Sequence, residues 1–552
     1  MSTPALLIAL AIGVPLALLL AAAVSPRLRA RMPPWLPIAP LPALFAAMAG
    51  GDGAVLAVGN ARFALRFGLD APGAMLLGAA ALLWIGSGAV AAWQARTGRR
   101  GGAFVVCWLM ALTGCVGVFL AADVVGFYFL LAVSSVGGTG LVLQGEGREA
   151  ARAAATYLGV ALVAEAVLLP GLILLALLAP DSLRITDGMA ALKALGARDA
   201  HPLRDAIVVL LAAGLAMKAG VVPSHFWMPL AYGAAPFAAA AVMSGAIVKA
   251  AVLALIRFLP LGTPLPQIGM PLAALGLAGA FYGVAVGIAQ TRCGHILAYS
   301  SVSQMGLLAA ILGMGLASGD GATGLAAAFY ATHHLLVKGA LFLAVGVVAH
   351  TGARHLRWTL LPVAIVALGL GGLPLTGGAL AKHAAKDLLG GGLVGTMATL
   401  SSVASTVLMV HFLWRLRGET AADPDARAPL VLTAAWLAMA AASLAAPWAL
   451  YLAIPRGAMP SALTAAALAG ALWPVLLGVV VAAALYLFAR RLPRIPPGDI
   501  AIALAGAKGR ALVDALGAGC GGVDLFARRW TVAALAFVLV TLVLAAALVP
   551  SG

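Results

Sequence analysis

Uninterrupted apolar stretches recur along almost the whole chain. Between Gly101 and Gln144, for example, Asp123 is the only charged residue. The hydrocarbon core of a bilayer requires ~20 apolar residues for each helical crossing. Only 9% of the 552 residues are charged, whereas soluble proteins carry about a quarter. We therefore predict an all-α polytopic membrane protein.

The lengths of these stretches predict about 14–16 transmembrane helices. The stretches are 4–24, 35–50, 72–95, 103–121, 124–143, 153–179, 206–222, 230–258, 268–290, 295–316, 323–349, 358–388, 393–416, 428–453, 468–489 and 530–549. Lysines and arginines gather where odd-numbered stretches end, which places those ends in the cytoplasm by the positive-inside rule. We therefore expect a bacterial-type inner-membrane protein with both termini outside.

Three segments between the stretches have distinct patterns. Residues 54–70 alternate around a Gly-Asn pair, which predicts a short external hairpin. Residues 181–205 balance acids against bases and are expected to form a small solvated cap. Residues 495–527 are interpreted either as an interfacial helix lying along the membrane or as a linker.

The rest of the composition excludes several protein classes. The net charge is +16, but the basic residues lie at the ends of apolar stretches, so we expect no nucleic-acid partner. The four cysteines have no C-x-x-C spacing, which argues against a disulfide framework or a metal site. No dinucleotide-binding fingerprint, P-loop or nucleophile elbow occurs in context. We expect no cofactor, no metal and no catalytic chemistry of the chain's own.

Ionisable side chains inside the apolar stretches are candidates for function, because charge at bilayer depth costs a few kcal/mol or more. They are Glu165, Lys218, Lys249, His333, His334, Lys338 and Lys382. Lys386 and His295 lie nearer stretch ends, where a side chain can snorkel to the surface. A buried lysine gives up its proton readily. Lysines bridged by histidines and water therefore suit proton movement rather than bond cleavage.

Helix breakers accompany two of these lysines. Pro223, Pro229 and Pro236 follow Lys218, while a Gly-rich run with Pro374 precedes Lys382. Broken helices at corresponding places in two halves of a chain point to an inverted-repeat transport site. Irregular backbone is tolerated at membrane depth where it lines a polar cavity.

The motifs around these residues resemble the proton-conducting transporter family. This family comprises the antiporter-like subunits of respiratory complex I, the large subunits of Mrp-type cation/proton antiporters and subunits of membrane-bound hydrogenases. The first motif contains Lys218, Pro223, His225, Trp227, Pro229, Pro236, Ser244, Lys249 and Arg257. Further similarity lies in HILAYSSVSQMG (295–306), HHLLVKGALFLAVG (333–346) and GLPLTGGALAK (372–382).

The resemblance implies two inverted five-helix repeats, each with one broken helix. The expected organisation is 1–100 for N-terminal helices, 101–260 and 261–417 for the two half-channels, and 418–552 for C-terminal helices. Lys218 would be the key lysine of the first half-channel, and Lys382 the terminal residue of the second. Lys249, His333, His334 and Lys338 would form the central relay.

One residue departs from the family pattern. The family's fifth helix carries a glutamate that pairs with the lysine corresponding to Lys218. Here the corresponding position is Ala132, nine residues after Asp123. Without a carboxylate partner, Lys218 would lose an electrostatic influence of ~1–3 pKa units. Glu165, one stretch later, is a hypothetical substitute.

Three functions follow from this interpretation. The leading one is a membrane subunit of a multi-subunit complex that translocates protons, with exchange for Na+ left open. The partners would then be other membrane subunits and, in some assemblies, a peripheral redox module. The second is a cation-coupled membrane subunit of a two-component inorganic-carbon uptake system with a large soluble zinc protein. The third is a non-conducting structural subunit.

Overall fold

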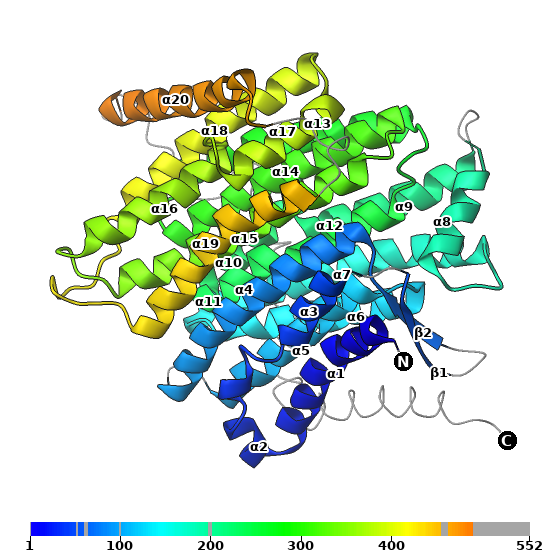
Figure 1. The fold of residues 1–552 in the computed structure, drawn as a ribbon, viewed down its shortest axis with the longest axis horizontal. Coiled ribbons are helices and arrows are strands. Elements are labelled where there is room, and N and C mark those ends of the chain that lie inside the picture. The colour runs from blue at the N-terminus through cyan, green and yellow to red at the C-terminus, as the bar shows by residue number, and fades with distance from the viewer. Residues whose placement is uncertain are drawn as a thin grey trace.

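The computed structural model describes residues 2–50, 53–59, 64–98, 101–196, 201–453 and 462–488. Within them, thirteen helices are long and apolar enough to cross a membrane. The predicted stretch 530–549 and the predicted interfacial helix or linker at 495–527 lie outside the described residues. The helices run roughly along a common direction (Figure 1). The all-α polytopic prediction is confirmed.

The N-terminal part contains α1 (Thr3–Val24), α2 (Pro26–Ala30), η1 (Pro33–Trp35), α3 (Leu41–Ala49) and α4 (Ala71–Arg96). Because α3 is only nine residues long, the predicted span 35–50 is not a full-length membrane helix. The predicted hairpin at 54–70 is confirmed: β1 (Val55–Gly59) pairs antiparallel with β2 (Ala64–Gly68), with Val55 opposite Gly68.

Two consecutive series of five helical crossings follow. The first contains α5 (Gly102–Leu120), α6 (Val124–Leu143), α7 (Gly147–Leu177), α9 (Pro202–Ala219) with α10 (Trp227–Ala234), and α11 (Phe237–Val242) with α12 (Val248–Phe258). The second contains α13 (Pro266–Ile288), α14 (Cys293–Ser318), α15 (Thr323–Ala349), α16 (Leu356–Gly371) with α17 (Gly377–Leu389), and α18 (Leu393–Leu416). The fourth crossing of each series is interrupted, as predicted.

The two predicted spans 206–222 and 230–258 are wrong in their boundaries. The break after α9 interrupts the helix without ending the crossing, so that α9 and α10 together form one apolar span, Pro202–Ala234. The next crossing begins at Phe237, and its α11 and α12 are joined by the π-helical turn η3 (Met243–Ile247). The proline before this crossing, Pro236, stands at the N-cap of α11.

The segment between α7 and α9 contains the short helix α8 (Ile185–Ala194). The start of α8 contacts the turn before α6, and this turn also contacts the hairpin. Asp123 accepts a hydrogen bond from the backbone N–H of Arg66 (2.6 Å), and the N–H of Ile185 donates to the carbonyl of Ala122 (3.1 Å). At the same end of the bundle, the Arg257 guanidinium at the end of α12 binds Asp70, the N-cap of α4, at 2.8 Å.

The most enclosed helices lie in the middle of the bundle. Every residue in an apolar 18-residue segment of α14 is buried, whereas only 17% of such a segment in α20 (Ala465–Phe488) is buried. The remaining described helix, α19 (Leu430–Ala453), packs against α15 and α4. Figure 1 places α20 at the opposite edge of the molecule from α1 and α2. The candidate residues His333, His334 and Lys338 on α15 therefore lie in the enclosed middle of the bundle.

Glycines allow α13 and α14 to approach each other closely. A Cβ atom added to Gly306 would lie 2.5 Å from the carbonyl oxygen of Gly276, and one added to Gly276 would lie 2.5 Å from the carbonyl oxygen of Gly306. Small residues in this arrangement bring helix backbones into direct contact in membranes. This contact fixes the position of α14, whose polar residues face the candidate site.

Substitution of Gly306 by Ala is expected to destabilise the protein by about 1–3 kcal/mol, the usual cost of overpacking. The measurement is the thermal unfolding midpoint in detergent. Gly13→Ala on α1 is the matched control, because a Cβ at Gly13 meets nothing within 4 Å. Equal midpoints for the two variants would contradict the close packing of α13 and α14.

Candidate functional site: a buried polar route

The first broken helix positions Lys218. Helix α9 ends at Gly220, whose φ of 72° is the left-handed conformation that commonly ends helices and that glycine adopts without strain. The chain continues through Pro223 and a short 3-10 turn, η2 (Ser224–Phe226), before α10 begins. The indole N–H of Trp227 donates to the carbonyl of Met217 at 3.2 Å and so ties the two halves together. Lys218 therefore lies in the last turn of α9, next to the break.

Lys218 forms a buried ion pair with Glu165 of α7. The distance from Lys218 Nζ to Glu165 Oε1 is 2.6 Å, and the two side chains are 7% and 11% exposed. Ser135 of α6 completes the contact: its Oγ accepts a hydrogen bond from Lys218 Nζ at 2.6 Å and lies 3.2 Å from Glu165 Oε1. Three helices thus contribute one residue each to a closed polar cluster.

This cluster places a carboxylate beside Lys218 even though position 132 is alanine. Ala132 lies three residues before Ser135 on α6, and residues three apart share a helix face. The hypothesis that Glu165 substitutes for the missing glutamate therefore has the geometry it requires. Sequence reasoning missed Ser135, because a serine in an apolar helix usually bonds only its own preceding turn, as Ser135 also does with Leu131.

Lys249 and Lys338 are connected through α14. Lys249 Nζ donates to the carbonyl of Ser244 (3.2 Å), which the π-helical turn before Lys249 presents. The hydroxyls of Ser244 and Ser301 lie 2.9 Å apart. Ser301 Oγ and Lys338 Nζ both donate to the carbonyl of Leu297, at 3.2 and 2.9 Å. Ser244 and the Leu297 carbonyl thus link the surroundings of the two fully buried lysines, although the contacts do not form one unbroken hydrogen-bonded chain.

The second broken helix positions Lys382 differently. Helix α16 ends at Gly371, and Gly372 (φ 103°) and Leu375 (φ 66°) turn the chain before α17 begins. Lys382 Nζ donates to the carbonyl of Gly371 at 2.6 Å. An ammonium group at a helix C-terminus is favourable because the last carbonyls of a helix carry partial negative charge. Pro374 lies inside this break.

Two buried histidines lie between Lys338 and the second break. His334 is fully buried and His333 is 3% exposed, and neither imidazole has a hydrogen-bond partner among the described residues. A Cβ on Gly378, at the start of α17, would lie 3.0 Å from His333 Nε2. The glycines that open α17 therefore allow His333 to contact the broken helix directly.

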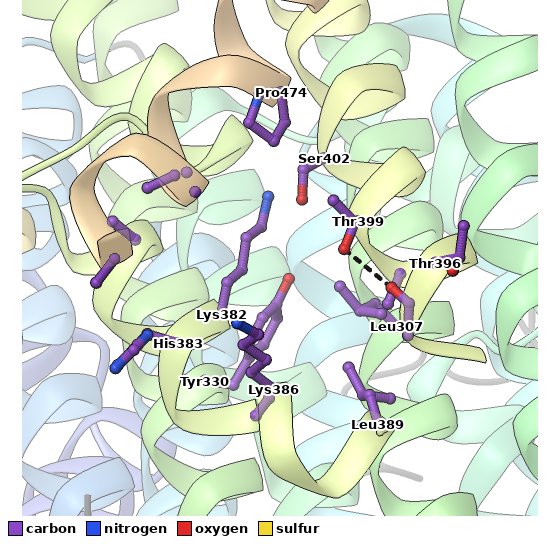
Figure 2. A pocket seen from close by; sticks show the side chains of 18 of the residues that line it. Leu307, Tyr330, Lys382, His383, Lys386, Leu389, Thr396, Thr399, Ser402 and Pro474 are labelled. Atoms are coloured by element: carbon purple, nitrogen blue, oxygen red, sulfur yellow. Dashed lines mark hydrogen bonds between the residues drawn. The ribbon is translucent and has the colours of Figure 1, made fainter. Parts of the chain in front are cut away.

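A cavity of about 380 Å³ opens beside Lys382 between α14, α15, α17, α18 and α20. Figure 2 shows Lys382 directed into it, toward Ser402 of α18. Tyr330 lines the cavity and donates to Gln304 Oε1 (2.6 Å), whose amide group donates to Ser405 (3.0 Å). Gln304 and Ser405 were missed from the sequence, although Gln304 is part of the quoted motif HILAYSSVSQMG.

Two further motif residues, His225 and Pro229, lie at the first helix break or just after it. His225 is fully buried, and its ring packs edge-on against Tyr282 at 4.8 Å. Pro229 lies in the first turn of α10. Among the described residues, no group of three or more His, Cys, Asp or Glu side chains is placed to hold a metal ion.

Comparison with known proteins identifies the family to which this architecture belongs. Residues 121–410, just over half of the chain, match the family described as NADH:quinone oxidoreductase/Mrp antiporter, transmembrane. The chain belongs to this family. The matched region contains Ser135, Glu165, Lys218, Lys249, Lys338, Lys382, His333 and His334.

The antiporter-like relatives are moderately similar. NADH-quinone oxidoreductase subunit N of Desulforudis audaxviator is 34% identical over 48% of this chain and 52% of its own length. One Na(+)/H(+) antiporter subunit of Bacillus subtilis is 29% identical over 51% of this chain and 37% of its own length. The chain therefore spans about half or less of these two relatives.

The fold matches a solved structure over most of its length. A chain in the structure of the Mrp complex from Dietzia sp. DQ12-45-1b superposes with a TM-score of 0.69 at 23% identity, covering 85% of this chain and 97% of that chain. The antiporter-like fold is thereby shown, and the chain is a multi-pass membrane protein of this type.

Removal of one partner of the buried ion pair is expected to destabilise the fold. Glu165→Gln leaves Lys218 without a counter-charge, and breaking a buried pair in this way costs about 3–5 kcal/mol. The double variant Glu165→Gln with Lys218→Met is expected to be the more stable, because no uncompensated charge remains. Thermal unfolding of the two variants measures the difference; a double variant less stable than Glu165→Gln would contradict the pairing.

Proposed function

We propose that this chain is the proton-translocating membrane subunit of a multi-subunit complex. The observation that carries the proposal is the buried Lys218–Glu165 pair, closed by Ser135. A buried ion pair is weak evidence for a stabilising role, whereas ionisable groups at membrane depth commonly serve transport. The pair also lies at a helix break, where transport sites of this class are found.

The proposed route runs from Lys218 to the cavity beside Lys382. A second cavity of about 30 Å³, lined by Lys218, Tyr157 and Val248, leaves room for water between α9 and the α12 turn that carries Lys249. From Lys249 the proposed route passes the hydroxyls of Ser244 and Ser301 toward Lys338; the Leu297 carbonyl accepts from Ser301 and Lys338 and positions them without carrying the proton. His334 and His333 follow on the same helix, and His333 contacts α17, which carries Lys382.

Each step transfers one proton between nitrogen or oxygen atoms and breaks no other bond. A neutral lysine accepts a proton, and the ammonium group then donates it onward. The negative charge of Glu165 favours the protonated form of Lys218. Transfer of the proton from Lys218 to the next lysine must therefore overcome this attraction. In this proposal, residues 101–260 and 261–417 act as the two half-channels.

The energy source is proposed to lie in partner subunits. The two relatives described above are named as subunits of an oxidoreductase and of an antiporter, which supports assembly with other membrane subunits here. A peripheral redox module would provide the driving reaction in an oxidoreductase-like assembly. Neither Na+ exchange nor a zinc-protein partner for carbon uptake is favoured by any described residue. The alanine at position 132 of the fifth helix is compatible with the carbon-uptake function but does not demand it, since Glu165 provides a carboxylate beside Lys218.

The proposed function can be tested by removing the carboxylate at position 165 and introducing one at position 132. Glu165→Gln is expected to reduce ΔpH-driven proton flux in proteoliposomes about tenfold or more, as for loss of ~1.4 kcal/mol of charge stabilisation. Adding Ala132→Glu to this variant is expected to restore flux, because position 132 lies one turn from Ser135 on the same face. The matched control is Ala132→Gln in the same background, which adds the volume without the charge.

The same proteoliposomes distinguish proton translocation from the alternative functions. Na+-gradient-driven proton movement would establish exchange, and bicarbonate-dependent uptake would establish the carbon-uptake function. Full flux in Lys218→Met, Lys338→Met and Lys382→Met would overturn the proposed lysine route, whereas no flux in the unmodified protein would leave the structural-subunit function.

A further inference from the structure

The two broken-helix lysines differ in what balances their charge. Lys218 has a carboxylate at 2.6 Å. Lys382 has only the Gly371 carbonyl at that distance, and no aspartate or glutamate is among the described residues that line its cavity. An ammonium group in a low-dielectric site requires a counter-charge or several hydrogen bonds. Within the described residues, Lys382 therefore has no carboxylate like the one that Glu165 supplies to Lys218.

The cavity instead offers unused hydrogen-bond donors. Lys382 uses one of its three N–H groups, on Gly371. Lys386 also lines the cavity, and Figure 2 shows it near Lys382 and Tyr330. No hydrogen bond is made by the Lys386 ammonium group or the Ser402 hydroxyl within the described part of the chain. His383, on the same helix, has a buried Nε2 atom without a partner.

We propose that this cavity binds a small inorganic anion, such as chloride or bicarbonate, between Lys382, Lys386 and Ser402. Two ammonium groups and a hydroxyl supply the donors that an anion requires, and the described lining residues include no carboxylate that would repel it. A volume of about 380 Å³ accommodates such an anion with several waters, since each water occupies ≈ 30 Å³ of liquid. Binding rests on the cavity alone, whereas a role as counter-ion to Lys382 rests on the proposed function.

With an anion bound in this cavity, each half-channel would have a negative charge beside the lysine of its broken helix. In the first, the counter-charge is the covalently attached Glu165. In the second, it is an exchangeable anion, so that proton movement through Lys382 depends on the anion available on the side to which the cavity opens. Lys386, which sequence reasoning left as a snorkelling side chain, becomes an anion ligand.

Tryptophan fluorescence tests binding directly, because Trp473 of α20 lines the cavity. The probe is iodide, added to the purified full-length protein in delipidated maltoside detergent. We expect saturable quenching that is absent in Trp473→Phe and is competed by chloride and bicarbonate but not by gluconate. Lys382→Gln is expected to weaken the apparent iodide affinity about tenfold, equivalent to ~1.4 kcal/mol.

Two variants sharpen the test. Ser402→Asp builds a carboxylate into the cavity and is expected to abolish saturable quenching, as Glu165 occupies the corresponding role beside Lys218. Lys193→Gln on α8, far from the cavity in sequence and not among its lining residues, changes the net charge equally and is expected to leave quenching unchanged. Non-saturable quenching, or the same affinity in the Lys382 and Ser402 variants as in the unmodified protein, would overturn the proposal.

A lipid phosphate has the same chemistry as a free anion. Competition of iodide by added phosphatidylglycerol, but not by chloride, would replace the proposed inorganic anion with a lipid headgroup. Glu165→Gln separates this proposal from the proposed function: anion quenching is expected to persist in that variant while proton flux falls. Loss of flux in Glu165→Gln without any anion binding in the unmodified protein would overturn the anion site alone.

Discussion

Burial of positive charge in an apolar bundle is the constraint around which this structure is organised. Lys218, Lys249, Lys338 and Lys382 lie inside a largely apolar bundle, and each ammonium group must be compensated locally. The fold solves this in three ways. Lys218 has a carboxylate, Lys249 and Lys338 have carbonyl oxygens on or beside α14, and Lys382 has the C-terminal carbonyl of α16.

Each solution depends on a departure from regular helix. The left-handed Gly220 ends α9 next to Lys218, the π-helical turn presents the Ser244 carbonyl to Lys249, and the turn after Gly371 exposes a carbonyl to Lys382. A continuous α-helix would use these carbonyls internally. The close packing of α13 on α14 through Gly276 and Gly306 in turn holds the Leu297 carbonyl and Ser301 in place. The buried lysines therefore depend on these irregular backbone segments for their position or their hydrogen-bond acceptors.

The sequence predicted the features that depend on the lengths of apolar stretches and on Gly and Pro residues at turns and helix breaks. The membrane fold, the hairpin at 54–70 and the two helix breaks follow from stretch lengths, a Gly-Asn turn and clustered Gly and Pro. The partner of Lys218 could only be offered as a hypothesis, because which faces of α6, α7 and α9 meet depends on helix rotation and packing. The boundary at 230 was wrong because a break within a crossing has the same local composition as a loop between two crossings. Ser135, Gln304 and Ser405 carry no charge, so nothing in the sequence distinguished them from ordinary helix-surface hydroxyls and amides.

The central claim is that Glu165 is the ionised partner of Lys218, and infrared spectroscopy tests it most directly. The difference spectrum between the unmodified protein and Glu165→Gln isolates the Glu165 carboxyl group. We expect the frequency of this carboxyl band to shift when Lys218 is changed to Met, because Glu165 then loses its partner at 2.6 Å. A Glu165 band that is unaffected by removal of Lys218 would show that the two groups are not coupled and would contradict the account.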